Sequence, residues 1–293
     1  MAPCTRATAS PRMARTGERI AIVGPGNMGA ALARGLRATW PSGGQGVTLS
    51  GRDPARVRDV ARRLGVRAAR SNRDAVEAAA IVVLAVKPQI LPSVLEQIRG
   101  SLRPGTTLLS IAAGIPTASL EAGAGPGIGV VRAMPNVAAS VRSSATAYSL
   151  GKSARPADRR RAKAVLESIG TAVEVDESLM DAVTGLSGTG PLYLFLILES
   201  LSDAGVKVGL SREVASHLAI QTLVGSAQLV RATGEHPAKL RDLVTSPGGT
   251  AITALHSLER SGLKAMLMDA VEAATRRSEE LGRKGKSASP AAP

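Results

Sequence analysis

Three glycines near the amino end have the spacing of a loop that holds a pyrophosphate. In the segment IAIVGPGNMGAALARGL, Gly24, Gly26 and Gly29 follow a short apolar run and begin a helical pattern. The first glycine permits a tight turn, the second lets the backbone approach the phosphates, and the third lets helix and strand pack closely. Free N–H groups at the start of the helix then face the pyrophosphate. The segment therefore predicts a dinucleotide site.

A choice between the two nicotinamide cofactors follows from the next strand end, Ser50-Gly51-Arg52-Asp53-Pro54. Sites for NAD place an acidic residue here, where it binds the ribose 2′-hydroxyl. Asp53 precedes a proline, however, and Asp-Pro is a favourable helix N-cap and first helical position. We predict that Asp53 is such a cap and that Ser50 and Arg52 receive the 2′-phosphate of NADP. The alternative is that Arg52 is one of many surface arginines in this segment.

Two more strand ends would border the nicotinamide side of the same crevice, where ligands bind in open α/β sheets. They are Ala85-Val86-Lys87-Pro88 and Ala112-Ala113-Gly114, and the second has side chains small enough to leave room for a ring. Lys87 is the only lysine before Lys152. We interpret Lys87 as a functional side chain and a candidate catalytic residue.

A second glycine loop, Ser246-Pro247-Gly248-Gly249-Thr250, precedes a helical segment in the last fifth of the chain. Free N–H groups and the positive dipole end at that helix start would hold a small carboxylate. The hydroxyls of Ser246 and Thr250 could complete the anion site. By itself, the pattern fits a plain capped helix start equally well.

The elements that would position these loops change in kind once along the chain. Short β-branched runs alternate with helical segments up to about Ala172, and several runs are continuously apolar, as in strands covered on both faces. This alternation predicts a mostly parallel sheet with right-handed crossovers. The predicted strands are 19–23, 47–50, 66–68, 80–86, 106–111, 128–134, 145–150 and 172–175.

After about Asp176 only helical patterns remain, and two of them, LYLFLILESL and Glu213–Arg231, are apolar on nearly every face. Such helices must be buried, and this short segment cannot bury them alone, so an intertwined dimer is expected. The predicted fold class is α/β, with an N-terminal Rossmann-type sheet and a C-terminal all-helical dimerisation domain. The predicted boundaries are a disordered tail 1–17, a nucleotide domain 18–175, a helical dimerisation and substrate domain 176–282, and a disordered basic tail 283–293.

Composition excludes several other classes of protein. The net charge of +14 is concentrated in residues 1–75, which hold fourteen arginines, no lysine and four acidic residues, so it is no general nucleic-acid signature. Four aromatic residues cannot form a stacking platform, one cysteine cannot form an internal disulfide, and three scattered histidines do not suggest a metal site. The longest apolar run, Leu192–Leu198, is far below the ~20 residues of a membrane span. A cytoplasmic protein without nucleic-acid or membrane partners is expected, although the Arg-rich start could instead be a transit peptide or an upstream mis-start.

Together, these segments resemble the pyrroline-5-carboxylate reductases, NADPH-dependent enzymes of the last step of proline synthesis. The resemblance covers about 20–281 and is carried, in order, by VGPGNMG, AVKP, AAGIP, RAMPN, DAVTGLSGTGP, GVKVGLSRE and LVTSPGGT. It implies a homodimer, with higher assembly left open, whose active site forms at the dimer contact. It also implies a cyclic imine carboxylate as substrate and NADPH as cofactor, with NADH as an alternative.

The resemblance further implies site residues. The cofactor would contact Val23, Gly24, Pro25, Gly26, Asn27, Met28, Gly29, Ser50, Arg52, Asn72, Ala85, Val86, Lys87, Pro88, Ala112, Ala113 and Gly114. The substrate would contact Ser246, Gly248, Gly249, Thr250 and Ala251, with Glu177 near its ring nitrogen. Thr250, Ser246 and Lys87 are the candidate catalytic residues.

The sequence departs from the family at informative positions. The family's glycine loop usually continues with a second threonine near the pyrroline nitrogen, whereas this chain has Ala251. Leu192 also stands at a position that is usually alanine in the family, so its side chain is larger. A non-catalytic NADP-binding regulatory homologue and a cyclic-imine reductase of shifted substrate are therefore the alternatives. A β-hydroxyacid dehydrogenase is disfavoured, because its lysine and asparagine positions hold Leu194 and Ile197.

Overall fold

The computed structural model describes residues 17–287 and divides the chain into two compact units. One unit ends at Gly188 and resumes at Thr275, and the other is Thr189–Ala274. The predicted tail 1–17 lies outside the described residues except for Gly17. The last helix continues to Ser287, so 283–287, placed by the sequence in a disordered tail, are helical. No proline occurs between Thr275 and Pro290 to interrupt the helical backbone. The rest of that tail lies outside the described residues.

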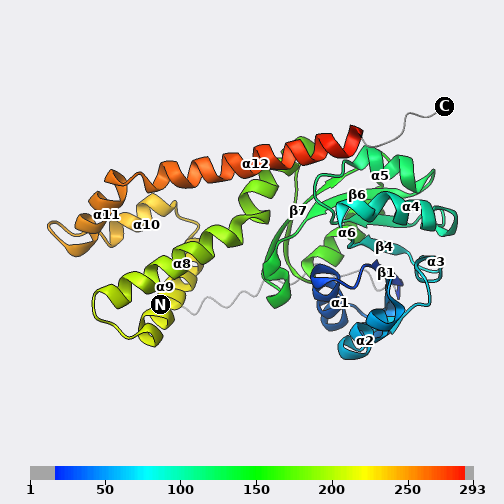
Figure 1. The fold of residues 1–293 in the computed structure, drawn as a ribbon, viewed down its shortest axis with the longest axis horizontal. Coiled ribbons are helices and arrows are strands. Elements are labelled where there is room, and N and C mark those ends of the chain that lie inside the picture. The colour runs from blue at the N-terminus through cyan, green and yellow to red at the C-terminus, as the bar shows by residue number, and fades with distance from the viewer. Residues whose placement is uncertain (1–16, 288–293) are drawn as a thin grey trace. The chain divides into compact units, whose positions relative to one another are not determined.

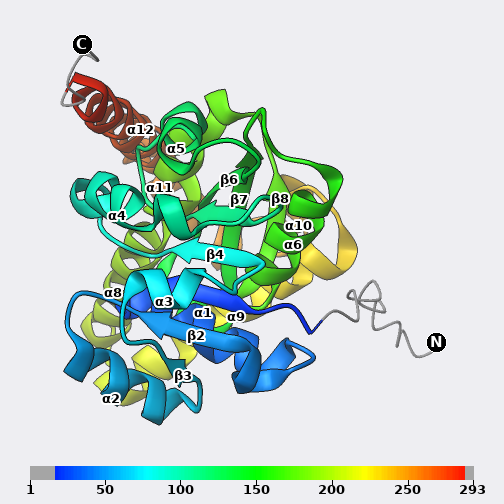
Figure 2. The same cartoon turned by 90° about the vertical axis from the view of Figure 1, so that its right-hand side faces the viewer.

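The first unit contains one eight-stranded sheet with the order β3-β2-β1-β4-β5-β6-β7-β8. Every neighbouring pair is parallel except β6 and β7, which confirms the predicted mostly parallel sheet. Figures 1 and 2 show the strands between layers of helices. The strands are β1 (Ile20–Val23), β2 (Val47–Ser50), β3 (Arg67–Ala68), β4 (Ile81–Leu84), β5 (Thr107–Ser110), β6 (Gly129–Met134), β7 (Ser144–Leu150) and β8 (Gly170–Glu174).

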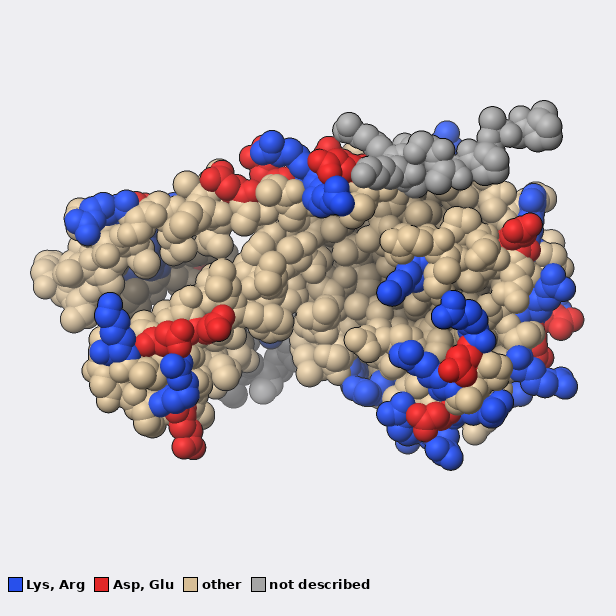
Figure 3. Space-filling model, in the orientation of Figure 1, with Lys and Arg blue, Asp and Glu red and all other residues tan. Residues whose placement is uncertain are grey.

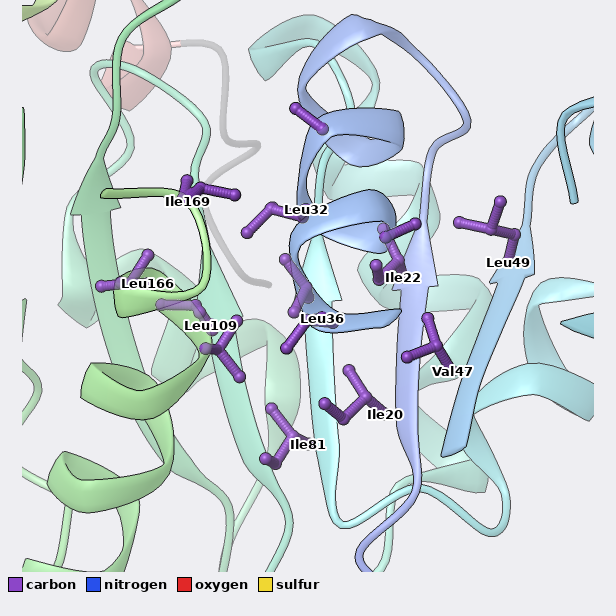
Figure 4. Close-up of a cluster of buried hydrophobic side chains, with 14 of the residues drawn as sticks. Ile20, Ile22, Leu32, Leu36, Val47, Leu49, Ile81, Leu109, Leu166 and Ile169 are labelled. Carbon is purple, nitrogen blue, oxygen red and sulfur yellow. The ribbon is translucent and has the colours of Figure 1, made fainter. Parts of the chain in front are cut away.

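Helices cover both faces of this sheet because its strands are apolar on both sides. Ile20 and Ile22 of β1 pack with Leu32 and Leu36 on one face, as Figure 4 shows, whereas Ala21 and Val23 belong to the core on the other. The first face carries α1 (Asn27–Thr39), α2 (Pro54–Leu64) and α6 (Pro156–Glu167), and the second carries α3 (Asn72–Val76), α4 (Leu91–Ile98) and α5 (Thr117–Ala124). The connecting segments contain the short turns η1 (Gly43–Gly46), η2 (Pro88–Ile90), η3 (Arg99–Ser101), η4 (Val137–Val141) and η5 (Glu177–Leu179). This part of the chain ends with α7 (Met180–Val183) and the π-helical turn η6 (Thr184–Gly188).

A buried carboxylate joins the middle of the sheet to α6. Asp158 is fully buried and accepts hydrogen bonds from the Thr107 hydroxyl, at 2.6 Å, and from the Arg155 backbone N–H, at 2.9 Å. Burial alone raises the pKa of the Asp158 carboxyl, but hydrogen bonds from Arg155 and Thr107 outweigh that effect and hold the pKa below its usual range. The ionised carboxylate therefore stabilises the contact between β5 and α6.

The second unit is helical throughout. Its elements are α8 (Gly190–Lys207), α9 (Arg212–Thr233), α10 (Pro237–Leu243), α11 (Thr250–Arg260) and the first half of α12 (Leu263–Ser287). Large apolar side chains on α8 and α9 are exposed in the single chain; Leu192, Phe195 and Leu196 are each more than 60% exposed. The stretch Glu177–Lys207 is long and apolar enough to cross a membrane by length and composition, and only 6% of its apolar window is buried. The single chain thus leaves uncovered the two helices expected to be buried.

Candidate functional site

The three glycines of the first loop occupy three different environments at the end of β1. Gly24 has φ +114°, and a Cβ there would lie 2.5 Å from the Ala85 carbonyl oxygen. A Cβ on Gly29 would lie 2.0 Å from the Gly24 carbonyl oxygen, so α1 passes directly over the turn. Among the described residues, nothing lies within 4 Å of the Cβ position of Gly26, the N-cap of α1, and no side chain caps the helix. The loop therefore presents free N–H groups toward open space, which suits a pyrophosphate.

Two buried polar atoms near the carboxyl ends of the strands have no partner within the described part of the chain. Ser50, the last residue of β2, is fully buried and its Oγ makes no hydrogen bond. Asn72 is 8% exposed; its amide donates to Gln97 Oε1 at 2.8 Å, while its Oδ1 is unpartnered. Unsatisfied buried polar atoms are rare in folded proteins. Both residues were predicted to contact the cofactor, and a nucleotide's hydroxyl and amino groups would satisfy them.

Of the two predictions made for the residues after Ser50, the structure tests the one for Asp53. The Asp53 carboxylate accepts hydrogen bonds from the N–H groups of Ala55, at 2.9 Å, and Arg56, at 3.2 Å, which confirms its role as the α2 cap. Arg52 is exposed, and its contact with a 2′-phosphate stays a prediction. Figure 3 shows lysine and arginine side chains gathered over the region of α2, so this part of the unit is favourable for an anion.

The two loops predicted for the nicotinamide side follow adjacent strands. Ala85–Pro88 leaves β4, where the Ala85 N–H donates to the Val23 carbonyl at 2.8 Å, and Ala112–Gly114 leaves β5. Because β1, β4 and β5 are parallel neighbours, these loops meet the glycine turn at one edge of the sheet. Lys87 is exposed and forms no ion pair with any described residue. Its catalytic role stays a prediction.

A buried arginine behind the loop after β5 was missed at the level of sequence. Arg132 of β6 is 7% exposed, and its guanidinium lies 3.4 Å from Glu177 Oε1 and 3.8 Å from Asp181 Oδ1. Glu177 also accepts hydrogen bonds from the backbone N–H of Thr117, at 2.7 Å, and from its hydroxyl, at 2.6 Å. These bonds place Glu177 in the first unit, and the contact predicted between Glu177 and the substrate ring stays a prediction. The RAMPN motif was the available signal, but Arg132 was one arginine among many.

The second glycine loop lies in the other unit and also opens a helix. Gly249 is the N-cap of α11, no side chain in the described part of the chain caps that helix, and Gly248 has φ +66°. Ser246 Oγ lies 2.2 Å from the Cβ position of Gly249, so the hydroxyl folds over the helix start. Ser246 and Thr250 are exposed, and Ala251 is half-buried in the first turn. The uncapped start of α11 can accept a carboxylate, whereas the individual roles of these residues stay predictions.

The Rossmann sheet, the glycine turn and the helical second part define a dinucleotide-binding protein with two domains. Two family models match the chain. The model described as NADP oxidoreductase, coenzyme F420-dependent, matches residues 19–114, and the model described as pyrroline-5-carboxylate reductase dimerisation matches residues 177–281.

Relatives match nearly the whole chain. A pyrroline-5-carboxylate reductase from Methanosarcina acetivorans is 42% identical over 267 residues, which are 91% of this chain and 99% of the relative. One from Arabidopsis thaliana is 38% identical and covers 90% of this chain and 95% of its own length. The chain belongs to the pyrroline-5-carboxylate reductase family, which confirms the resemblance seen in the sequence motifs.

Solved structures agree with this assignment. The pyrroline-5-carboxylate reductase of Coxiella burnetii has a TM-score of 0.85 and 32% identity, and the match covers 91% of this chain and 99% of that chain. The Plasmodium falciparum pyrroline carboxylate reductase, solved with NADP bound, has a TM-score of 0.80 and 33% identity over 90% of this chain and 98% of that chain. The predicted fold class and NADP cofactor are thereby confirmed.

Proposed function

We propose that this chain reduces 1-pyrroline-5-carboxylate to L-proline in the cytoplasm, as the last step of proline biosynthesis. The observation that carries the proposal is the pair of helix starts with a glycine N-cap and no side-chain cap from the described residues, at Gly26 and Gly249, within a chain of this family. One start suits a dinucleotide and the other a small carboxylate, which are the two anions that this reaction needs.

The cofactor half of the site is built from main chain and small side chains. The N–H groups of Asn27, Met28 and Gly29 would hold the pyrophosphate, with Val23–Gly26 forming the turn. Ser50 and Arg52 would receive the 2′-phosphate and Asn72 a further polar group, while Lys87, in Ala85–Pro88, would balance phosphate charge. Ala112–Gly114 would border the ring. NADPH, when bound, supplies the hydride for the C=N carbon, and NADH is the alternative donor.

The substrate half of the site fixes the imine by its carboxylate. The N–H groups at the start of α11 and the hydroxyls of Ser246 and Thr250 would bind the carboxylate, and Gly248 and Gly249 would let it approach. Ala251 would lie toward the ring. A protonated imine already carries the positive charge that activates its carbon, so these residues need to orient the ring and exclude water rather than donate a proton.

The exposed apolar faces of α8 and α9 would be covered by a second copy of the chain. The dimerisation family model spans these helices. An intertwined dimer would bury their apolar faces, so that neither a membrane nor a nucleic acid is needed to cover them. Phe195→Asp should convert the dimer to a monomer in analytical ultracentrifugation. Val141→Asp, at an apolar residue of the sheet unit that is 72% exposed against 61% for Phe195, should leave the dimer intact. A dimer that survives Phe195→Asp would place the contact elsewhere and leave the apolar faces of α8 and α9 without a partner in this proposal.

The activity test is NADPH oxidation by the purified full chain with 1-pyrroline-5-carboxylate. Ser246→Ala should raise the KM for the imine several-fold, whereas Ser257→Ala, near the far end of α11, makes the same chemical change away from the site and should not. A folded dimer that binds NADPH without turning over the imine would instead identify a non-catalytic regulatory homologue.

A further inference from the structure

The buried cluster around Arg132 lies at the edge of the sheet that holds the cofactor loops. Arg132 pairs in register with Ser110, the last residue of β5, and the loop Ala112–Gly114 follows directly. A guanidinium only 7% exposed needs close carboxylates, and Glu177 and Asp181 provide them. The three side chains come from β6, η5 and α7.

Glu177 acts as the cap of a helix that lies 60 residues earlier in the chain. α5 begins at Thr117 after Pro116, whose side chain cannot cap it. The Glu177 carboxylate takes that place by accepting hydrogen bonds from both the N–H and the hydroxyl of Thr117, at 2.7 and 2.6 Å. Arg132 in turn orients the carboxylate. The start of α5, and with it the end of the Ala112–Pro116 segment, is therefore fixed to β6 by a charged hydrogen-bond chain.

Asp181 fixes the same loop from a second side. Its Oδ1 accepts a hydrogen bond from the hydroxyl of Ser278, on α12, at 2.6 Å. The partners of Asp181, Arg132 and Ser278, thus lie far from it in the sequence. One turn further along α12, a Cβ on Gly282 would lie 3.3 Å from the Gly114 carbonyl oxygen, so α12 packs closely on the loop.

We infer that Arg132 and Glu177 are positioning residues that hold the Ala112–Gly114 loop in the conformation required by the nicotinamide ring. The inference rests on the proposed function for the location of that ring. Neither residue needs to touch the substrate. Arg132 orients the Glu177 carboxylate, the carboxylate fixes the position of the start of α5, and the start of α5 fixes the conformation of the loop. Asp181 and Ser278 complete the support through α12.

The decisive variant is Glu177→Gln, because glutamine keeps the side-chain size but cannot accept hydrogen bonds with both terminal atoms. The matched control is Glu174→Gln, three residues earlier, which removes a similarly exposed carboxylate bonded to Arg159 at 2.8 Å. The full-length dimer is compared by turnover, by NADPH binding from fluorescence, and by binding of adenosine 2′,5′-bisphosphate, which lacks the nicotinamide half.

Glu177→Gln should lower kcat/KM for NADPH about tenfold or more, from the loss of a charge-assisted hydrogen bond. The Kd for adenosine 2′,5′-bisphosphate should stay within about twofold, and the control should match the wild type in every measurement. Thr117→Val, which removes only the hydroxyl, should act in the same direction and serves if Glu177→Gln fails to fold.

Unchanged kcat/KM in both variants would overturn the inference, and so would a parallel loss of adenosine bisphosphate binding, which indicates general unfolding. A wild type without turnover would count against the proposed function instead. In that case the ratio of the NADPH and adenosine bisphosphate Kd values would still decide the role of Glu177.

Discussion

Substitution by alanine should have different effects at two glycines of the nucleotide loop. Gly26 has φ −77° and ψ −175°, which alanine adopts freely, and nothing lies within 4 Å of its Cβ position. At Gly29 the same methyl group would lie 2.0 Å from the Gly24 carbonyl oxygen, a backbone atom that can move only with the turn itself. Gly26→Ala should therefore affect cofactor binding, and Gly29→Ala should affect folding.

The expected magnitudes differ accordingly. Gly26→Ala should change the free energy of unfolding by less than about 1 kcal/mol, because the lower entropy of the unfolded chain offsets the poorer N-cap. A methyl group in the pyrophosphate position should remove charge-assisted hydrogen bonds of about 1.5–3 kcal/mol, which raises the Kd for NADPH about 10- to 150-fold. Gly29→Ala should cost about 1–3 kcal/mol of stability from overpacking, a fall in Tm of roughly 2–12 °C for a unit of this size.

NADPH titration followed by fluorescence, together with differential scanning calorimetry, separates the two effects. Gly100→Ala is the control, since Gly100 also has open space at its Cβ position but lies in η3, away from the glycine turn. It should leave both Kd and Tm unchanged. Tight NADPH binding by Gly26→Ala, or an equal loss of Tm in the variants at Gly26 and Gly29, would refute the geometry assigned to the loop.

Three further substitutions test other parts of the argument. Ala251→Thr restores the hydroxyl usual in the family and should raise kcat/KM about tenfold, measured with five- and six-membered cyclic imines; no gain with either ring would show that the hydroxyl is dispensable here. Arg52→Ala should raise the KM for NADPH about 10- to 100-fold and leave that for NADH unchanged; an equal change for both would remove Arg52 from the 2′-phosphate site. Asp158→Asn should lower the free energy of unfolding by about 1–3 kcal/mol at pH 7. The Asp158 carboxyl has a lowered pKa when folded, so its stabilisation is present above the unfolded pKa and is lost as the pH falls through the folded pKa. Denaturant titrations should therefore converge for the two proteins at low pH, and a constant difference would contradict this assignment.

The sheet could be predicted from the sequence because its signals are local. Most strands are short runs of β-branched or apolar residues between turn residues, and Ile81–Leu84 and Gly129–Met134 lie within the predicted 80–86 and 128–134. Asp53 was predictable for the same reason, since a cap and its partners lie within a few residues of each other. The glycine loops are likewise contiguous.

The Arg132 cluster could not be predicted from the sequence because its partners are distant along the chain. Thr117 and Glu177 are 60 residues apart, and Asp181 and Ser278 are 97 residues apart. Nothing near Glu177 or Asp181 in the sequence indicates which hydrogen-bond donor its carboxylate will meet. Ser50 illustrates the same limit: the sequence places it at a strand end, but only the packed sheet shows that its hydroxyl is buried without a partner.

The two helix starts that carry the proposed function share one conformation. The N-caps Gly26 and Gly249 have φ −77° and −80° with ψ near 180°, and neither helix receives a side-chain cap from residues 17–287. By contrast, α2, α9 and α10 are capped by Asp53, Ser211 and His236, which leaves those helix starts less able to bind an anion. For the substrate this difference has a chemical consequence. Neutral N–H groups hold a carboxylate with partial charges of about +0.5 in total, whereas an arginine or lysine would put a full positive charge beside an imine that is itself positive and would disfavour its protonated form. An uncapped helix start would therefore bind the acid end of the proposed substrate without weakening the activation of the bond to be reduced.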